Sequence, residues 1–242
     1  MKNKVDILGV EFINTTLLQL VNTLTTRLKN EEKTFIVTAN PEIVMQSIQD
    51  EEYKKALDSA NMVIADGIGV VIASKILQNP LPERVAGYDL MLKLLEVANN
   101  ESYKVYLLGA EETVLAKTIS NIEKQYENVQ IVGSHHGFFD SNNIEISNQI
   151  KDLQPDLVFV ALGVPRQEKW IYQNLKQMNK GIFIGVGGSF DVIAGNVKRA
   201  PEIWQKLNLE WFYRLVKQPS RWKRMLALPQ FIIKVILKKF KG

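Results

Sequence analysis

Residues 157–167 read LVFVALGVPRQ, an unbroken apolar run that reaches a glycine and then continues into a helical pattern. A strand with no polar residue along it is covered on both faces, which is typical of a parallel sheet with helices above and below. Five other short runs rich in β-branched residues lie along the chain, and most are apolar throughout. Together these runs predict strands at residues 35–39, 62–65, 105–109, 129–133, 157–162 and 182–186.

Helical patterns fill the intervals between these strands, so each interval supplies the crossover that parallel strands need. The sequence therefore predicts an α/β fold, a Rossmann-like and mostly parallel sheet with helices on both faces, over residues 1–195. The segment KRAP (198–201) interrupts the pattern, and a C-terminal helical appendage follows at residues 196–242. The expected helices of the sheet domain span residues 41–60, 67–78, 88–99, 111–126, 142–153 and 166–178.

The composition limits the classes of protein to which the chain can belong. Of its 242 residues, 46% are hydrophobic, enough for one α/β domain with a substantial core. The absence of cysteine excludes disulfides, thiolate metal sites and a cysteine nucleophile. The first ten residues carry three charges and no long apolar segment, so we expect no signal peptide and a cytoplasmic protein. No apolar run reaches the ~20 residues of a spanning helix.

Charge is divided unevenly along the chain. Nine of its 30 Lys and Arg residues follow Glu210, where there is no Asp or Glu, so the tail carries a formal +9. The other 21 face 26 acidic residues, which leaves residues 1–210 at −5. Because tryptophans and aliphatic residues lie among the tail charges, an anionic membrane surface fits them better than nucleic acid does. We expect peripheral association with the inner face of the cell membrane.

The end of the tail has the spacing of an amphipathic helix. One alternative is a helix that packs on its own domain and exposes a basic face. Membrane binding is favoured because each Lys or Arg near an anionic surface contributes roughly 1 kcal/mol. The face expected to insert comprises Ile232, Ile233, Ile236, Leu237 and Phe240, and the opposite face comprises Lys234, Lys238 and Lys241.

Polar residues and glycines follow the strands, where ligands of open α/β sheets bind. Repeated glycine at a strand-to-helix turn lets backbone amides approach a phosphate, so a nucleotide is the expected ligand. The chain has no GxGxxG or GxxxxGK[ST] motif, which disfavours a dinucleotide dehydrogenase and a P-loop enzyme. The candidate substrate-binding residues at these turns are Gly109, Ala110, Gly163, Pro165, Arg166, Gly187, Gly188 and Asp191, the last also a candidate for stabilising a turn near Gly195.

Asp66 stands alone at the end of an apolar strand, between Ala65 and Gly67. It is a candidate helix N-cap or, held in a partly desolvated cleft, a general base. Thr38 and Asn40 end another strand and could position a hydroxyl-bearing substrate beside it. For Arg84 the sequence leaves two alternatives open, a surface ion-pair partner and an anion clamp.

No DxD pair and no His/Asp cluster has the spacing of a divalent-metal site, so we expect no metal and no cofactor. Backbone amides and arginines would then have to balance the charge of a diphosphate. Arg221 and Arg224 lie three residues apart on one helix face, and Arg214 lies a short distance before them. The alternative for these three arginines is the basic membrane face, and the two roles are compatible.

Taken as ordered blocks, the strand-end motifs resemble the WecG/TagA/CpsF glycosyltransferase family, most closely its TagA branch. The resemblance spans nearly the whole chain. The blocks are TANPE (38–42), ADGIG (65–69), RVAGYD (84–89), ALGVPRQE (161–168), GVGGSFD (185–191), RAP (199–201) and LEW (209–211).

The resemblance implies inverting, metal-independent sugar transfer from a nucleotide-diphosphate donor to a polyprenyl-diphosphate-linked acceptor at the inner membrane face. For the TagA branch the donor is UDP-N-acetylmannosamine (UDP-ManNAc). The acceptor is undecaprenyl-diphosphate-linked N-acetylglucosamine (GlcNAc), and the β-1,4 product is the linkage unit of wall teichoic acid. The family's base falls on Asp66, with Thr38, Asn40, Arg84 and Gln167 in the same catalytic pocket.

Three alternatives stay open at this point. Other branches use other sugars, such as the uronic acid of N-acetylmannosamine or glucose. A peripheral membrane protein that senses a UDP-sugar without catalysis would need the same pocket. An NAD-dependent sugar oxidoreductase is disfavoured by the missing dinucleotide motif. The sequence does not decide whether the chain forms a homo-oligomer.

Overall fold

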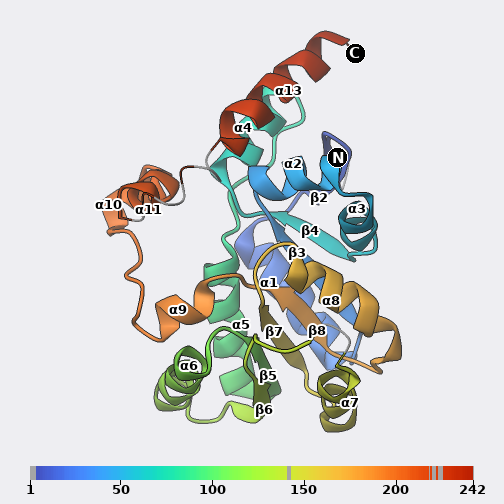
Figure 1. Cartoon of the computed structure of the whole chain (residues 1–242), viewed down its shortest axis with the longest axis vertical. Coiled ribbons are helices and arrows are strands. Elements are labelled where there is room, and N and C mark those ends of the chain that lie inside the picture. The colour runs from blue at the N-terminus through green and yellow to red at the C-terminus, as the bar shows by residue number, and fades with distance from the viewer. Residues whose placement is uncertain (1–3, 141–142, 218, 220–221, 223–225, 242) are drawn as a thin grey trace.

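The protein forms a six-stranded parallel sheet with helices on both faces, in a computed structural model that describes residues 4–140, 143–217, 219, 222 and 226–241 (Figure 1). The sheet has the strand order β4-β3-β8-β7-β5-β6. All the strands expected from the sequence are confirmed, within a residue or two at their ends. They are β3 (Thr34–Ala39), β4 (Met62–Ala65), β5 (Lys104–Gly109), β6 (Gln130–His135), β7 (Leu157–Ala161) and β8 (Ile182–Gly185).

The strand register brings the carboxyl ends of the strands to one edge. Ala39 at the end of β3 pairs with Ala65 at the end of β4. On the other side of β3, the end of β7 pairs with the end of β8 through Val160 and Gly185. The segments that follow these four strands therefore start side by side, as the sequence predicts for a ligand site.

Alternate residues of each strand serve two separate layers of core. In β3, for example, Phe35 and Val37 point into one layer and Ile36 into the other, and all three are fully buried. This is why most of the strands are apolar throughout. One layer is covered by α1 (Leu17–Lys29), α5 (Gly87–Glu101), α6 (Glu112–Gln125) and α9 (Ser189–Ile193). The other is covered by α2 (Pro41–Gln49), α3 (Glu51–Asp58), α4 (Ile68–Ile76), α7 (Ile144–Leu153) and α8 (Arg166–Asn174).

The helix expected at residues 41–60 is two helices, because Asp50 ends α2 and starts α3. Its backbone is extended, and its Oδ1 accepts a hydrogen bond of 2.9 Å from the backbone N–H of Tyr53. An aspartate at an N-cap competes with helix continuation in this way. The expected helix at residues 166–178 likewise ends earlier, at Asn174, and a short 3₁₀ turn, Leu175–Gln177, follows.

Residues 4–29, for which the sequence patterns predict no strand or helix, form a hairpin and a helix. Strands β1 (Lys4–Ile7) and β2 (Val10–Ile13) pair antiparallel and alternate exposed with buried residues. The buried side chains of the hairpin join the core on the α2–α4 face. Thr16 is the N-cap of helix α1, and its side chain forms a capping box with Gln19. The hairpin packs against β4 and α4, and α1 packs against α5.

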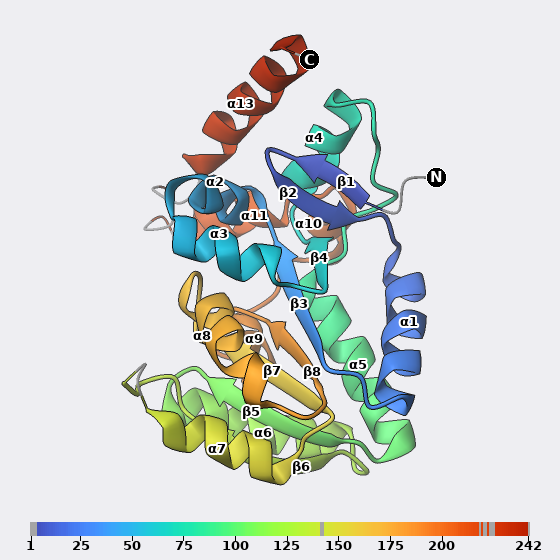
Figure 2. The same cartoon turned by 90° about the vertical axis from the view of Figure 1, so that its right-hand side faces the viewer.

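The C-terminal segment forms α10 (Glu202–Lys206), α11 (Glu210–Lys217) and α13 (Ala227–Lys241). Helix α13 lies against α2 and α4 and extends away from the sheet (Figures 1 and 2). Its Phe231 and Val235 are fully buried in the main core. The sequence pattern predicts one apolar face and one basic face for the tail helix, whereas the structure has two apolar faces on opposite sides of it. The face that contains Phe231 and Val235 packs on the domain.

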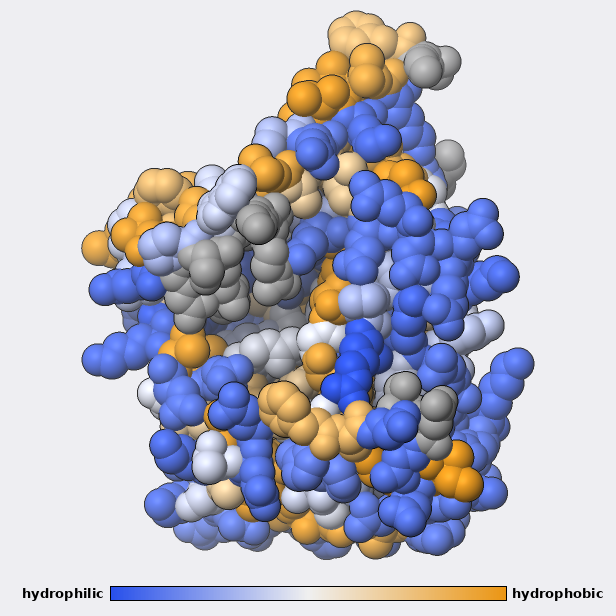
Figure 3. All heavy atoms as spheres, viewed as in Figure 1, coloured by the Kyte–Doolittle hydropathy of each residue, from blue (hydrophilic) through white to orange (hydrophobic). Residues whose placement is uncertain are grey.

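The second apolar face of α13 is exposed, and Figure 3 shows apolar side chains along this helix and on the α10–α11 pair. None of the helices that the structure describes is long and apolar enough to cross a membrane. The exposed apolar residues of α13, called the outer stripe below, are Ile233, Ile236, Leu237 and Phe240.

Candidate active site

A cleft of about 330 Å³ opens at the carboxyl edge of the sheet, between the ends of β3, β4, β7 and β8 and the C-terminal segment. This volume is at the lower end of the range for small-molecule sites. Figure 3 shows the hollow on the face that carries α10 and α11. All five predicted catalytic residues line it, as do three of the predicted substrate-binding residues: Thr38, Asn40, Asp66, Arg84, Gln167, Gly187, Gly188 and Asp191.

Asp66 follows β4 directly and reaches the cleft because the chain beside it is tightly packed. Its N–H donates to the carbonyl of Ala39 at 3.0 Å, which continues the β3–β4 ladder by one bond. A Cβ on Gly67 would lie 2.8 Å from Pro41 Cδ, so only glycine allows this approach. The N-cap of α4 is Gly67 and has no side-chain cap, so the capping role considered for Asp66 is not the one it has. Its carboxylate is 32% exposed in the cleft.

Thr38 and Asn40 bring two further polar side chains to the same wall. The Thr38 hydroxyl is buried and donates to the carbonyl of Gly185 at 2.9 Å, which ties β3 to β8. The Asn40 Oδ1 accepts from the N–H of Ile43 at 3.0 Å and so caps α2. Both side chains therefore have fixed orientations before any substrate binds.

Arg84 is held from two sides. Its Nε donates to the main-chain oxygen of Asp66 at 2.7 Å, and its Nη2 lies 2.9 Å from Oε2 of Glu210. The same Nε is 3.9 Å from Oδ1 of Asp66. Of the two alternatives from the sequence, the structure therefore has Arg84 in an ion pair, but a largely buried one that crosses to the C-terminal segment.

Gln167 lines the cleft from a buried position, and its side chain bonds to the turn after β8. Its Oε1 accepts from the N–H of Gly187 at 3.1 Å, and its Nε2 donates to Oε1 of Glu168 at 2.7 Å. Because the amide of Gly187 is used in this way, it is not free for a phosphate. Gly187 instead provides the left-handed backbone, φ +51°, that exposes Gly188 to the cleft.

Glu168 is a fully buried carboxyl, and burial raises its pKa to about 7 from 4.5. Between these two values the folded protein holds a proton that the unfolded chain releases. The free energy of unfolding therefore falls as the pH rises from about 4.5 to about 7, by up to the order of 3 kcal/mol. We expect Glu168→Gln to remove this pH-dependent loss. The free energy of unfolding of the variant should therefore rise relative to that of the wild type between pH 5 and pH 8.

Urea denaturation of both proteins at pH 5 and pH 8 measures this difference. The matched control is Glu123→Gln, which changes an exposed carboxylate to the same amide. Equal changes in unfolding free energy with pH for the wild type and Glu168→Gln would contradict the prediction.

The remaining predicted residues of the glycine turns lie at the same sheet edge but do not line the cleft. The Arg166 guanidinium lies over the Phe139 ring, 4.6 Å from its centroid, and donates to the carbonyls of Gly137 and Phe139. Arg166 thus holds the loop after β6. The others are Gly109 and Ala110, which pack against Ala161, and Gly163 and Pro165, which start α8.

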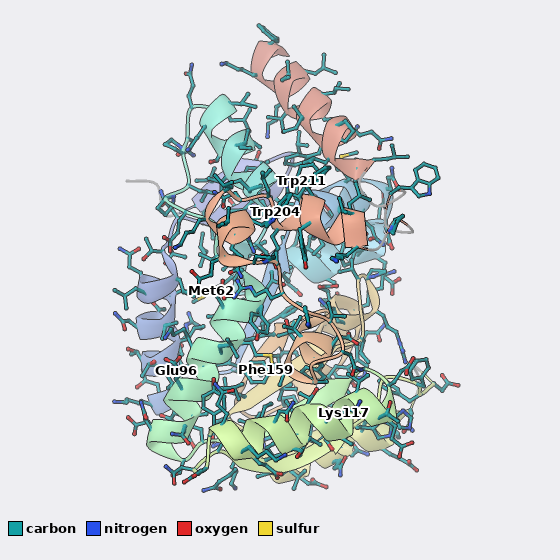
Figure 4. All side chains as sticks on the ribbon, turned by 90° about the vertical axis from the view of Figure 1, so that its left-hand side faces the viewer. Met62, Glu96, Lys117, Phe159, Trp204 and Trp211 are labelled. Atoms are coloured by element: carbon teal, nitrogen blue, oxygen red, sulfur yellow. The ribbon has the colours of Figure 1, made fainter. Side chains whose placement is uncertain are left out.

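The tail arginines named from the sequence stay predictions. Arg214 belongs to α11, Glu210–Lys217, and its side chain is not described. Arg221 and Arg224 lie outside the described residues. The described tail residues that line the cleft include Trp211, Tyr213 and Lys217 from α11 and Leu228 from α13. Figure 4 shows Trp211 and Trp204 together on the α10–α11 pair, where Trp204 stacks on Phe212 at 6.1 Å.

The sequence missed the residues that join the tail to the cleft. Arg199 forms a two-bond ion pair with Asp89 on α5, at 2.6 and 2.8 Å, and lies over the ring of Tyr88. Glu210 lies between Arg199 and Arg84. The one available signal was that Glu210 is the last acidic residue of the chain, at the start of a strongly basic tail.

Among the described residues, no group of three or more His, Cys, Asp or Glu side chains could hold a metal ion. Within the described part of the cleft, positive charge comes from Arg84, Lys198, Arg199 and Lys217.

Residues 5–242 match the family described as Glycosyl transferase WecG/TagA/CpsF family. Three similar proteins all bear the name N-acetylglucosaminyldiphosphoundecaprenol N-acetyl-beta-D-mannosaminyltransferase. The Bacillus subtilis (strain 168) protein is 45% identical over 83% of this chain and 78% of its own length. The Bacillus spizizenii protein is 40% identical over 94% and 88%, and the Staphylococcus aureus (strain MW2) protein 41% over 98% and 94%.

Proposed function

The chain belongs to the WecG/TagA/CpsF glycosyltransferase family, and from this membership we propose that it transfers N-acetylmannosamine from UDP-ManNAc to undecaprenyl-diphosphate-linked GlcNAc. Such a product is the linkage unit of wall teichoic acid. The observation that carries the proposal is identity of 40–45% with transferases of that name over most of the chain. The cleft supports it, because a partly exposed carboxylate, Asp66, and a largely buried arginine, Arg84, lie together where a sugar and a diphosphate could meet.

We propose a single displacement with Asp66 as the base. The C4 hydroxyl oxygen of the acceptor GlcNAc bonds to the anomeric carbon of the donor, from the face opposite UDP. The bond from that carbon to the diphosphate oxygen breaks, and its electron pair leaves with UDP. The hydroxyl proton passes to the Asp66 carboxylate. One carboxylate suffices for this step, whereas glycoside hydrolysis uses a pair of acids. Attack from the face opposite UDP inverts the anomeric carbon and gives a β-linkage.

The diphosphate would be stabilised without a metal, by cationic side chains. Lys198 and Lys217 line the described cleft, and Arg214, Arg221 and Arg224 of the tail are further candidates. Cationic side chains that are already in place when negative charge develops on the leaving diphosphate lower the reaction barrier most effectively. The assay described below, run with an excess of EDTA, tests the metal-free part of the proposal: undiminished turnover is expected.

The acceptor is lipid-linked, so we propose that the tail holds the cleft at an anionic membrane surface on the cytoplasmic side. The outer stripe of α13 points away from the domain, and Lys234 and Lys239 of the same helix are exposed, whereas Lys238 pairs with Asp6 of β1. The free energy gained by inserting apolar residues into the interface and that gained by lysines near anionic headgroups would both favour membrane binding.

The direct test is an assay of UDP release from purified full-length protein, UDP-ManNAc and a lipid-linked GlcNAc-diphosphate analogue. We expect release of UDP only when the acceptor is present, together with a product heavier by one N-acetylhexosamine in mass spectrometry. UDP-GlcNAc, UDP-glucose and the UDP-linked uronic acid of N-acetylmannosamine serve as competing donors. We expect UDP-ManNAc to be preferred.

Other outcomes separate the alternatives. Turnover with another of these donors would assign the chain a different sugar within the same family. UDP-sugar binding without turnover, for any donor, would favour the non-catalytic sensor and contradict the proposal.

A further inference from the structure

Glu210 is the first residue of α11 and a buried carboxylate, with its side chain 6% exposed. A desolvated carboxylate is strongly unfavourable unless cationic groups face it. Two arginines from separate parts of the chain do so. Arg84 Nη2 lies 2.9 Å from Oε2, and Arg199 Nε lies 3.9 Å from Oε1. The carboxylate therefore has a specific electrostatic environment at the junction of tail and cleft.

The two arginines link this carboxylate to opposite ends of the site. Arg84 uses its Nε on the main-chain oxygen of Asp66, at 2.7 Å, so one guanidinium bridges the Asp66 peptide and Glu210. Arg199 continues on the other side to Asp89 of α5. The Arg199 Nε is buried and has no hydrogen-bond partner in the described structure, so the Arg199 contact with Glu210 is the looser of the two.

We propose that Glu210 is a positioning residue: its carboxylate holds the Arg84 guanidinium against the Asp66 peptide and thereby makes the geometry of the cleft depend on the docked position of α11. This inference rests on the proposed function, for which it names an additional residue. The arrangement is specific because an arginine has a planar fork that can serve two acceptors at once. Without Glu210, the Arg84 side chain loses the partner that fixes its far end.

A purely structural role makes a different prediction. If Glu210 only fastened α11 to the domain, breaking the neighbouring Arg199–Asp89 pair would loosen the same helix and have the same effect on turnover. If Glu210 acts through Arg84, the two changes differ. Asp89 does not line the cleft, and Asp89→Asn is therefore the matched control.

The test compares Glu210→Gln, Asp89→Asn, Arg84→Lys and the double variant Glu210→Gln/Arg84→Lys in the full-length protein. We expect Glu210→Gln to lower kcat about tenfold or more and to change KM for the donor much less. The kcat of Asp89→Asn should stay within about twofold of the wild type, because Asp89 does not line the cleft and its partly exposed pair with Arg199 contributes little to stability. In the Arg84→Lys background, Glu210→Gln should cost less than about twofold further, because a single ammonium cannot bridge Glu210 and the Asp66 peptide as the guanidinium does.

Hydrogen exchange of the same proteins needs no substrate. Glu210→Gln should speed exchange in residues 65–69 and 84–86, whereas Asp89→Asn should leave both segments unchanged. The inference is overturned if Glu210→Gln leaves these segments as protected as in the wild type. It is also overturned if Asp89→Asn lowers kcat as much, or if the Glu210→Gln effect is the same in both Arg84 backgrounds. A wild-type protein that releases no UDP would contradict the proposed function alone, since the exchange result would still decide the role of Glu210.

Discussion

Asp66→Asn is expected to lower kcat by about 10²–10⁴-fold, the range that a general base contributes. The amide has the shape of the carboxylate but cannot accept the acceptor's proton. The fold should be retained, because the substitution keeps two main-chain contacts that hold residue 66: its N–H donates to Ala39, and its carbonyl accepts from Arg84. UDP release in the lipid-linked acceptor assay measures the effect, and unchanged thermal unfolding shows that the protein is intact.

Two other aspartates make this experiment specific. Asp152→Asn changes an exposed residue away from the cleft and should leave kcat unaltered. Asp191 lines the same cleft, so Asp191→Asn asks whether any cleft carboxylate would serve. Undiminished activity of Asp66→Asn, with a large loss for Asp191→Asn, would move the role of base from one residue to the other.

Ile236→Glu/Phe240→Glu is expected to abolish membrane association and leave the cleft intact. Phe240 is 81% exposed and Ile236 39%, so neither substitution disturbs the core. The buried Phe231 and Val235 still dock α13 on the domain. Each buried methylene contributes about 0.8 kcal/mol, and two new carboxylates oppose an anionic surface. Together these terms predict a fall in partition of roughly 10³-fold or more.

Co-sedimentation with vesicles of anionic phospholipid measures the partition. Activity should be lost on an acceptor embedded in the vesicles but retained on a short-chain soluble analogue. The control, Leu18→Glu/Ile144→Glu, places the same charges on two exposed apolar residues of α1 and α7. Sedimentation of the tail variant at the wild-type level would exclude the outer stripe as the membrane contact.

These substitutions separate effects that a deletion would combine. Removing residues 201–242 takes away Phe231 and Val235 together with the outer stripe, and so uncovers part of the main core. Loss of activity after such a deletion would not distinguish membrane binding from stability.

Much of the fold could be read from local patterns. Six short runs, most of them apolar throughout, predicted the strands of the sheet, because a strand buried on both faces has few polar positions. The hairpin at residues 4–13 was not predicted, because its strands are only four residues long and alternate polar with apolar positions. The break at Asp50 was also missed: the residues on either side continue a helical pattern, and the capping bond alone interrupts it.

The candidate site divides in the same way. Its first half follows from the sequence, because parallel strands bring their carboxyl ends to one edge, and Thr38, Asn40, Asp66 and Gln167 all lie at or shortly after such ends. The glycine turn after β5 has the same local signature, yet Gly109 and Ala110 pack beside β7 outside the cleft. Strand order decides this, since β5 lies two strands from β8, and strand order is not encoded in any single segment.

By itself, then, the sequence determined which segments are strands, that their polar ends share an edge, and that a basic, apolar tail follows. Only the tertiary structure decided that α13 has one apolar face in the core and one outside, and that Arg84 meets a glutamate 126 positions later. The physical reason is that periodicity records whether a residue is buried, not what buries it. An ion pair across the chain depends on how two distant elements pack, and each partner alone looks like any other charged residue.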